Sequence, residues 1–271
     1  MRRRAKPLLG TLVEISIEAA SEAALLHATD LAFAQVEEVH RAMSFHEPDS
    51  DLRRLARVPA GGALEISPHT ARVLRLALQM ELGSGGVFNP TITPALVTSG
   101  LLPAPDGAQV PQARSLASAI EWRGEHRLCV LAPVWVDLGG IAKGYAVDCA
   151  VFALQSAGVA AGLVNAGGDM RAFGAQSHLV HLRFAAGLRA VASLQNAAVA
   201  TSCNAERGAS SPHIDPRSGW PVHSRQSVMV QAPSAAVADA LTKVAMLSPA
   251  TADRLCSELQ SQWRAFDYFE S

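Results

Sequence analysis

The sequence predicts an α+β protein, because segments with strand patterns and segments with helix patterns fall into separate runs along the chain. A long helical pattern occupies residues 21–43, several short strand patterns follow one another over 162–231, and two further helical patterns lie after them. A doubly wound α/β protein would instead alternate strands with helices. With 271 residues and neither a linker nor an internal repeat, the chain is expected to form a single domain over 1–271.

The N-terminal half is expected to hold one strand and three helices. Alternating apolar residues predict the strand, and Ser or Asp at the N-cap followed by apolar residues at helical spacing predict the helices. These elements are a strand over 12–17, a helix over 21–43, a short helix after Asp49 or Ser50, and a helix over 67–83. The buried face of the first long helix is expected to comprise Leu25, Leu26, Ala32, Phe33, Val36 and Val39. The following stretch, 83–111, is rich in Gly and Pro and should be mostly irregular.

The C-terminal half is expected to be a helix, a run of strands and two closing helices. The first helix covers 141–157 and ends at Gly158, with Ile141, Ala142, Tyr145, Ala146, Cys149, Phe152 and Ala153 as its apolar positions. The other expected elements are strands over 162–166, 179–184, 189–194, 197–201 and 226–231, then helices over 234–247 and 251–259.

Composition excludes several classes of function. The chain is 49% hydrophobic and 17% charged, which is typical of a globular protein. A net charge of −1 argues against nucleic acid as a partner. No apolar run is long enough for a signal peptide or a membrane span, and no lipid-anchor motif is recognised, so membrane insertion is not expected. The four cysteines are scattered without a C-x-x-C pair, which indicates reduced thiols and a cytoplasmic location.

The segment 135–174 is the most informative part of the sequence, because it holds two glycine pairs, each beside an acid. Gly139 and Gly140 come just before the helix over 141–157. Backbone N–H groups at such a helix start lack partners within the helix and lie at the positive end of the helix dipole. A phosphate is therefore the ligand that this position favours. Lys143 adds a full positive charge one turn in. An ordinary strand-to-helix turn is the competing interpretation, since neither G-x-G-x-x-G nor a P-loop spacing is present.

The second glycine pair, Gly167 and Gly168, follows a strand pattern and precedes Asp169. Glycines in this position predict a sharp backbone bend or a close approach to another group. Asp239 is expected in the first turn of the helix over 234–247, where an acid is electrostatically favoured in any case. His213 lies in the loop 211–222, which contains a Pro-Arg-Ser-Gly turn and is expected to be an edge segment.

With these residues in view, the chain resembles the ApbE-type flavin transferases, the FAD:protein FMN transferases formerly described as thiamine-biosynthesis lipoproteins. Here it resembles a divergent member without a lipobox. The resemblance covers nearly the whole chain, in the order of the family motifs. The segments that carry it are PLLGTLVEI, AMSFHEPDSDLRRL, GVFNPTITP, VDLGGIAKGYAVD, LVNAGGDMRAFG, ATSCNAERG, HIDPRSGWPV and ADALTKVAML.

The resemblance implies an α+β fold with a central FAD cleft and a Mg²⁺ ion near the FAD pyrophosphate. It also implies a reaction in which a Ser or Thr hydroxyl of an acceptor flavoprotein takes FMN as a phosphoester and AMP leaves. The positions that match FAD-contacting positions of the family are Leu9, His46, Val87, Phe88, Asn89, Asp137, Gly139, Lys143, Gly167, Gly168, Asp169 and Ile214. The metal positions match Gly140, through its carbonyl, and Asp239, while Asp239, Lys243 and His213 are the candidate catalytic residues.

One departure from the family pattern concerns the metal. The family has Thr four residues after the Asp of the closing helix, whereas this chain has Lys243 there and Thr242 one position early. A shift of one helical position turns Thr242 by about 100°, and residues four apart are neighbours, so Lys243 can reach Asp239. Lys243 then either replaces the metal, or turns outward while Mg²⁺ binds through Asp239, the Gly140 carbonyl and water. An FAD-binding protein without transfer activity and an FAD pyrophosphatase are the alternative functions.

Overall fold

The computed structural model describes residues 1–107, 109–203, 213–222, 224 and 226–267. The chain folds into two compact units, each made of stretches that are distant in the sequence. Unit 1 comprises residues 1–38, 143–209 and 223–271, and unit 2 comprises residues 39–142 and 210–222. The single domain expected over 1–271 stays a prediction, since neither unit is one continuous piece of chain.

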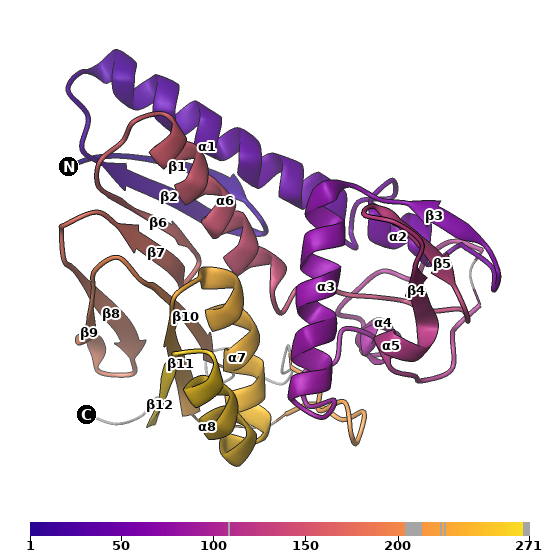
Figure 1. Cartoon of the computed structure of the whole chain (residues 1–271). Coiled ribbons are helices and arrows are strands. Elements are labelled where there is room, and N and C mark those ends of the chain that lie inside the picture. The colour runs from indigo at the N-terminus through magenta and orange to yellow at the C-terminus, as the bar shows by residue number, and fades with distance from the viewer. Residues whose placement is uncertain (108, 204–212, 223, 225, 268–271) are drawn as a thin grey trace. The chain divides into compact units, whose positions relative to one another are not determined.

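Unit 1 is built on a seven-stranded sheet with the strand order β1-β2-β6-β7-β10-β11-β12 (Figure 1). The strands are β1 (Arg2–Leu8), β2 (Thr11–Ile17), β6 (Gly162–Ala166), β7 (Asp169–Phe173), β10 (Ala198–Cys203), β11 (Gln226–Ala232) and β12 (Gln262–Asp267). Every neighbouring pair is antiparallel. Antiparallel pairing allows the tight turns between β1 and β2 and between β6 and β7, which bring loop residues to one end of the sheet.

Helices cover one face of this sheet. They are α6 (Ala142–Ser156), α7 (Ala235–Leu247), α8 (Pro249–Glu258) and the first part of α1 (Glu22–Met43). Helix α7 lies against β7, β10 and β11. Its start is set by Ser234, whose hydroxyl accepts the Val237 N–H, and Gly158 ends the turn after α6 with a φ of +81°.

A two-stranded hairpin covers the opposite face. It comprises β8 (His178–Phe184) and β9 (Gly187–Leu194). Val180 and Leu194 of the hairpin form a buried cluster with Ala172, Val199 and Met229 of the sheet. Successive residues of a strand point to opposite faces, so the neighbouring Ala198, Ala200, Val228 and Val230 face the helices. The sheet is therefore a middle layer, buried on both sides.

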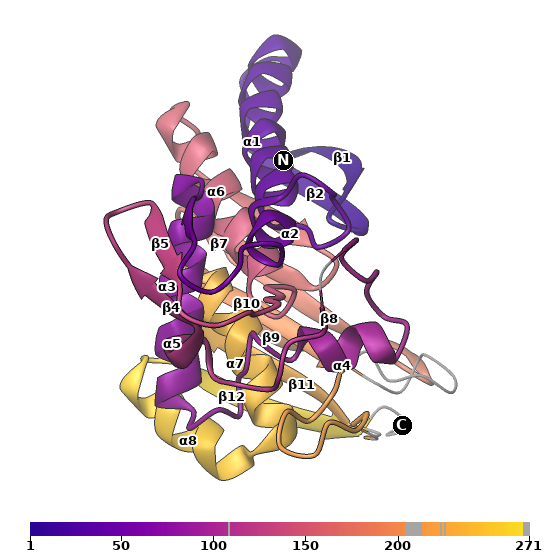
Figure 2. The same cartoon turned by 90° about the vertical axis from the view of Figure 1, so that its right-hand side faces the viewer.

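Unit 2 is a helical assembly around a small sheet with the strand order β3-β5-β4. Its elements are α2 (Asp51–Leu55), β3 (Ala63–Glu65), α3 (Pro68–Gly83), α4 (Thr93–Thr98), α5 (Leu116–Ala119), β4 (Ile120–Trp122) and β5 (Arg127–Val130). Helix α3 lies beside the β4–β5 hairpin (Figure 2), and Arg75 stacks on the Trp122 ring at 3.6 Å. The buried carboxylate of Glu81 accepts the Leu116 N–H at the start of α5, and burial raises the pKa of that carboxyl.

The α+β fold predicted from the sequence is confirmed, and the structure corrects several details. Strands β1, β3, β4, β5, β7 and β12 were not expected, and neither were the short helices α4 and α5. Leu26 is exposed, and so is Phe152, with 72% of its surface accessible. Ile141 and Ala146 are buried as expected, but the buried face of α6 also contains Val147, Ala150 and Leu154. This helix is apolar on nearly all sides, so periodicity alone cannot choose its inner face.

Two expectations from composition can be compared with the structure. Among the described residues, no helix combines the length and the apolar character that a membrane span requires. All four cysteines are thiols.

Candidate functional site

The site in unit 1 begins with the first turn of α6. The first four N–H groups of a helix have no partner within that helix. The Gly144 N–H, the third of them, donates to Oδ2 of Asp239 on α7 at 3.2 Å. A carboxylate on α7 thus accepts one of the free N–H groups at the start of α6, where the sequence predicts an anion-binding position.

The reverse contact also exists, so the two helices cap each other. Asp148 of α6 accepts the N–H groups of Ala235 and Ala236 at 2.9 and 3.0 Å, at the start of α7. Gly144 makes this approach possible, because a Cβ atom there would lie 2.1 Å from the Ala235 carbonyl oxygen. The α6–α7 contact therefore fixes Asp239 beside the start of α6.

Lys143 lies between two buried carboxylates. Its Nζ atom is 2.6 Å from Oδ2 of Asp169 on β7 and 3.5 Å from Oδ2 of Asp239. Burial lowers the pKa of Lys143, but the two carboxylates outweigh it, and the pKa is raised above its usual value. Burial and the Asp239 charge raise the pKa of Asp169 to about 6, against the effect of Lys143. Burial also opposes ionisation of Asp239, but Lys143 and Lys243 lower its pKa overall.

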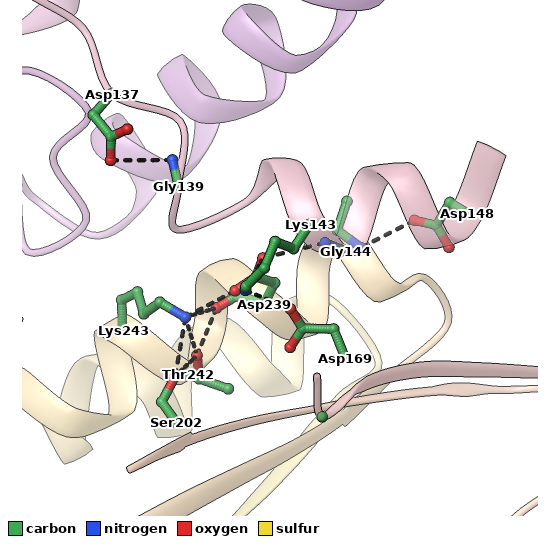
Figure 3. Close-up of polar contacts among 12 residues, drawn as sticks. Asp137, Gly139, Lys143, Gly144, Asp148, Asp169, Ser202, Asp239, Thr242 and Lys243 are labelled. Atoms are coloured by element: carbon green, nitrogen blue, oxygen red, sulfur yellow. Dashed lines mark hydrogen bonds and ion pairs between the residues drawn. The ribbon is translucent and has the colours of Figure 1, made fainter. Parts of the chain in front are cut away.

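Lys243 reaches Asp239, as the four-residue spacing predicts. Its Nζ atom is 2.8 Å from Oδ1 of Asp239, 3.0 Å from the Ser202 hydroxyl and 2.9 Å from the Thr242 hydroxyl. Figure 3 shows this ammonium pointing toward the three side chains rather than outward, and only 18% of the Lys243 side chain is exposed. Thr242 was expected to point away, but its hydroxyl accepts from Lys243 and lies 2.8 Å from that of Ser202.

The raised pKa of Asp169 predicts a pH-dependent stability. A folded-state pKa of about 6, above the ordinary 3.8, means that folding favours the protonated carboxyl. This contribution is complete below pH 4 and is lost as the pH rises through 6. Compared with Asp169→Asn, the wild type should therefore lose about 1 kcal/mol of unfolding free energy between pH 5 and 7. Urea unfolding of both proteins at these two pH values measures the difference. A constant difference, or one that grows with pH, would contradict the assignment.

Two turns of unit 1 lie at the same end of the sheet as Asp169. Gly167 and Gly168 form the β6–β7 turn with φ values of +63° and +103°, which confirms the sharp bend expected from the sequence. A Cβ on Gly167 would lie 2.5 Å from the Thr11 hydroxyl, beside the β1–β2 turn. Leu9 in that turn has a φ of +56°, an unusual conformation for a bulky residue. Leu9, the glycine pair and the lysine–aspartate cluster thus belong to one unit.

The other candidate residues belong to unit 2. Asp137 folds back so that its Oδ2 accepts the Gly139 N–H at 3.1 Å (Figure 3), and its own N–H donates to the Pro90 carbonyl. A carboxylate therefore already occupies one donor of the first glycine pair. Gly140 follows in the same turn, before α6.

The flavin-contacting segment expected at 87–89 is largely interior. Val87 and Phe88 are buried, and Asn89 accepts the Thr91 N–H and hydroxyl at 2.8 and 2.7 Å. This Asx-type arrangement fixes the backbone that leads to Pro90. The segment can offer backbone atoms to a ligand more readily than the side chains of Val87 and Phe88.

The remaining candidates lie in loops of unit 2. His46 is exposed after α1. Ile214 is buried and pairs with Pro221, while the His213 carbonyl accepts the Val222 N–H at 2.8 Å. Asp215 and Arg217 close the intervening turn, and the Arg217 hydrogen bond lowers the pKa of Asp215. The edge segment and the turn are thus present, while residues 211 and 212 of this motif and most of the ATSCNAERG motif lie outside the described residues.

The side chains around Asp239 do not fit a divalent cation as they lie. Oδ1 accepts from the Lys243 ammonium, and Oδ2 accepts from the Gly144 N–H with the Lys143 ammonium at 3.5 Å. A cation at either oxygen would face two positive charges. Over the described ranges, no group of three or more His, Cys, Asp or Glu side chains is arranged to hold a metal.

Sequence reasoning missed Asp148, Ser202 and Gly144 as parts of this site. Asp148 carried a usable signal, because it is the only acidic residue in the largely apolar α6. Its other partner, Arg171 on β7, lies 2.6 Å from Oδ1. The role of Gly144 depends on how closely α7 approaches, which no local pattern encodes.

Comparisons with known proteins agree with this architecture. Two solved structures share the fold. An ApbE protein from Thermotoga maritima has a TM-score of 0.84 and 23% identity, and the match covers 97% of this chain and 93% of the other. The flavin transferase ApbE from Vibrio cholerae has a TM-score of 0.81 and 24% identity, and the match covers 97% of this chain and 92% of the other.

Sequence relatives point the same way. A protein of Haemophilus influenzae named FAD:protein FMN transferase is 28% identical over 77% of this chain and 69% of its own length. A protein of the same name from Rhodobacter capsulatus is 28% identical over 86% of this chain, which spans about half (49%) of that relative. The model of the ApbE family matches residues 9–266. A match over nearly the whole chain, on the matching fold, shows that this protein belongs to the ApbE family.

Proposed function

We propose that this protein is an FAD:protein FMN transferase, which cleaves FAD, attaches FMN through a phosphoester to a Ser or Thr of an acceptor flavoprotein and releases AMP. The observation that carries the proposal is the charged cluster of Lys143, Lys243, Asp169 and Asp239 at the start of α6. Relatives named for this activity support it. Besides the acceptor flavoprotein, the proposed partner is FAD itself. A nucleic-acid partner is not proposed.

Lys143 is the residue best suited to bind the FAD pyrophosphate. An ammonium has three N–H donors, and Asp169 and Asp239 account for two of them. About a third of the Lys143 side chain, 32%, is exposed, and a phosphate oxygen is proposed to bind the third donor. The carboxylates hold the ammonium in place, and the positive end of the α6 dipole adds to the attraction.

The reaction needs a new bond, a broken bond and one proton transfer. The acceptor hydroxyl oxygen bonds to the phosphorus on the FMN side of the pyrophosphate, and the bond from that phosphorus to the bridging oxygen breaks. AMP leaves with the bridging oxygen and its electron pair, while the hydroxyl proton passes to a general base. Positioning and charge neutralisation by the lysines lower the barrier.

An assay with FAD separates this function from the alternatives. The purified protein is incubated with FAD alone, and with FAD plus an extract of the source organism. Free FMN and AMP from FAD alone indicate a pyrophosphatase. AMP together with a fluorescent flavin band that survives denaturing gel electrophoresis, mapped by mass spectrometry to Ser or Thr, indicates transfer. Binding without AMP in either mixture would contradict the proposal.

Lys143→Met should reduce the rate of AMP release on the order of 100-fold, the loss typical when one donor to a developing anion is removed. The matched control is Lys6→Met, because Lys6 is a surface lysine of the same unit that pairs with Glu37 at 3.6 Å. It should keep the wild-type rate. Equal rates for both variants would show that Lys143 only supports the fold.

A further inference from the structure

We propose that the Lys243 ammonium is the resident cation of this site, so that Asp239 binds no divalent metal in the wild-type protein. The catalytic part of this inference rests on the proposed function, whereas the metal-binding part stands without it. Both follow from three features of the cluster: its oxygen ligands, its charge balance and the choice of lysine.

Four oxygen atoms surround the Lys243 ammonium. They are Oδ1 of Asp239 at 2.8 Å, the Thr242 hydroxyl at 2.9 Å, the Ser202 hydroxyl at 3.0 Å and the Asp239 backbone carbonyl at 3.4 Å. Carboxylate, hydroxyl and carbonyl oxygens are the ligand types that a hard cation such as Mg²⁺ prefers. Ser202, Asp239 and Thr242 are buried. The ammonium therefore uses, in the interior of unit 1, a set of atoms of the kind that would bind a metal.

The charges of the cluster balance without a metal. Asp169 and Asp239 carry two negative charges, and Lys143 and Lys243 carry two positive charges. A divalent cation would leave an excess of two positive charges in a largely buried space, which is unfavourable at low effective dielectric constant. Removing Lys243 would leave the cluster one positive charge short and would open Oδ1 of Asp239. The site without Lys243 is thus the one that would attract a metal.

The use of lysine here is selective. Of the 23 basic residues in the chain, only those at 6, 143 and 243 are lysines, and the others are arginines. Two of the three lysines contact the same carboxylate, Asp239. An ammonium is a compact point charge with donors in three directions, whereas guanidinium is a planar fork. Only the ammonium can sit among four closely spaced oxygens as a small cation does.

The test is a Mn²⁺ titration of the protein without FAD, followed by electron paramagnetic resonance, in which bound Mn²⁺ disappears from the signal of the free ion. The wild type should show no binding at the site. Lys243→Thr removes the ammonium and supplies a hydroxyl, so it should bind one Mn²⁺ at least about tenfold more tightly than the wild type. Lys6→Thr, the same change at a surface lysine, should behave like the wild type. Thermal unfolding checks that each variant is folded.

Two outcomes overturn the inference. One is tight, stoichiometric Mn²⁺ binding by the wild type, and the other is a folded Lys243→Thr variant that binds no better than the wild type. A second measurement follows AMP release from FAD with EDTA present. The wild-type rate should be unaffected, while Lys243→Thr should depend on added Mg²⁺. If no variant cleaves FAD at all, the proposed function fails, but the Mn²⁺ titration still decides whether Lys243 excludes the metal.

Discussion

Replacing Asp239 by Asn should abolish most of the activity and destabilise unit 1. Oδ1 of Asp239 accepts from Lys243, and Oδ2 accepts from the Gly144 N–H and faces Lys143. An Asn side chain has one acceptor oxygen and one NH₂ donor. In either orientation its NH₂ group meets another donor, and the two ammonium groups lose a counter-charge.

The expected cost of Asp239→Asn is about 3–5 kcal/mol of unfolding free energy, the range for breaking a buried ion pair on one side. The rate of AMP release should fall on the order of 1000-fold, because both lysines lose their fixed positions. Urea unfolding and the FAD assay measure the two effects. Asp30→Asn is the control, since Asp30 pairs with Arg4 at the surface with 57% of its side chain exposed, and it should cost under about 1 kcal/mol. A variant as active as the Asp30 control would refute the central role of Asp239.

Gly144→Ala should also be strongly destabilising, against the direction that helix propensity predicts. In an exposed helix, Gly to Ala gains about 1 kcal/mol. Here the new Cβ would lie 2.1 Å from the Ala235 carbonyl oxygen, which is backbone and cannot rotate away. Helix α6 would have to move from α7, and the Gly144–Asp239 hydrogen bond would break. We expect a loss of about 3 kcal/mol, at the upper end for overpacking.

The melting temperature measures this loss, which should appear as a decrease of roughly 6–12 °C in a protein of this size. Gly124→Ala is the matched control, because among the described residues its added Cβ would meet only the Arg127 Cβ within 4 Å, at an ordinary contact distance of 3.8 Å. That variant should melt within about 2 °C of the wild type. If Gly144→Ala melts higher than the wild type, the close α6–α7 contact does not exist in solution.

The elements that the sequence predicted well are those whose sequence features lie within a few neighbouring residues. Ser50, Ser67 and Ser234 each accept a backbone N–H at the start of a helix, and an N-cap serine is readable from its position alone. The Gly167–Gly168 bend is local in the same sense, because positive φ values at two successive residues nearly require glycine.

The strands that the sequence did not reveal depend on partners elsewhere in the chain. Strand β12 alternates only weakly and lies at the edge of the sheet, where pairing with β11 provides its order. Strand β1 is the opposite edge and is basic, and its register is set by β2. Edge strands often carry charged residues that conceal the usual strand pattern.

The candidate site was partly predictable for the same reason. The spacing of Asp239 and Lys243 within one helix predicts their contact. The position predicted for Asp239, in the first turn of its helix, was wrong. Asp239 lies in the second turn of α7 and is fully buried, so the helix dipole does not explain why an acid occurs there. The contacts of Lys143 with Asp169 and Asp239 join three elements, and the hydrogen bond from Lys243 to Ser202 joins α7 to a fourth, β10. Such contacts follow from the packing of α6, α7 and the sheet.

The mutual capping of α6 and α7 also dictates an order of assembly. The Gly144–Asp239 and Asp148–Ala235 contacts join residues 95 and 87 positions apart. Until α7 has been synthesised and has docked, the Gly144 N–H at the start of α6 lacks its acceptor on Asp239. Asp148 likewise lacks the two N–H donors at the start of α7. Closing such long loops costs chain entropy before any contact is gained. The charged cluster therefore cannot form before α7 has docked on α6, and a chain in which this contact is open carries no preassembled site.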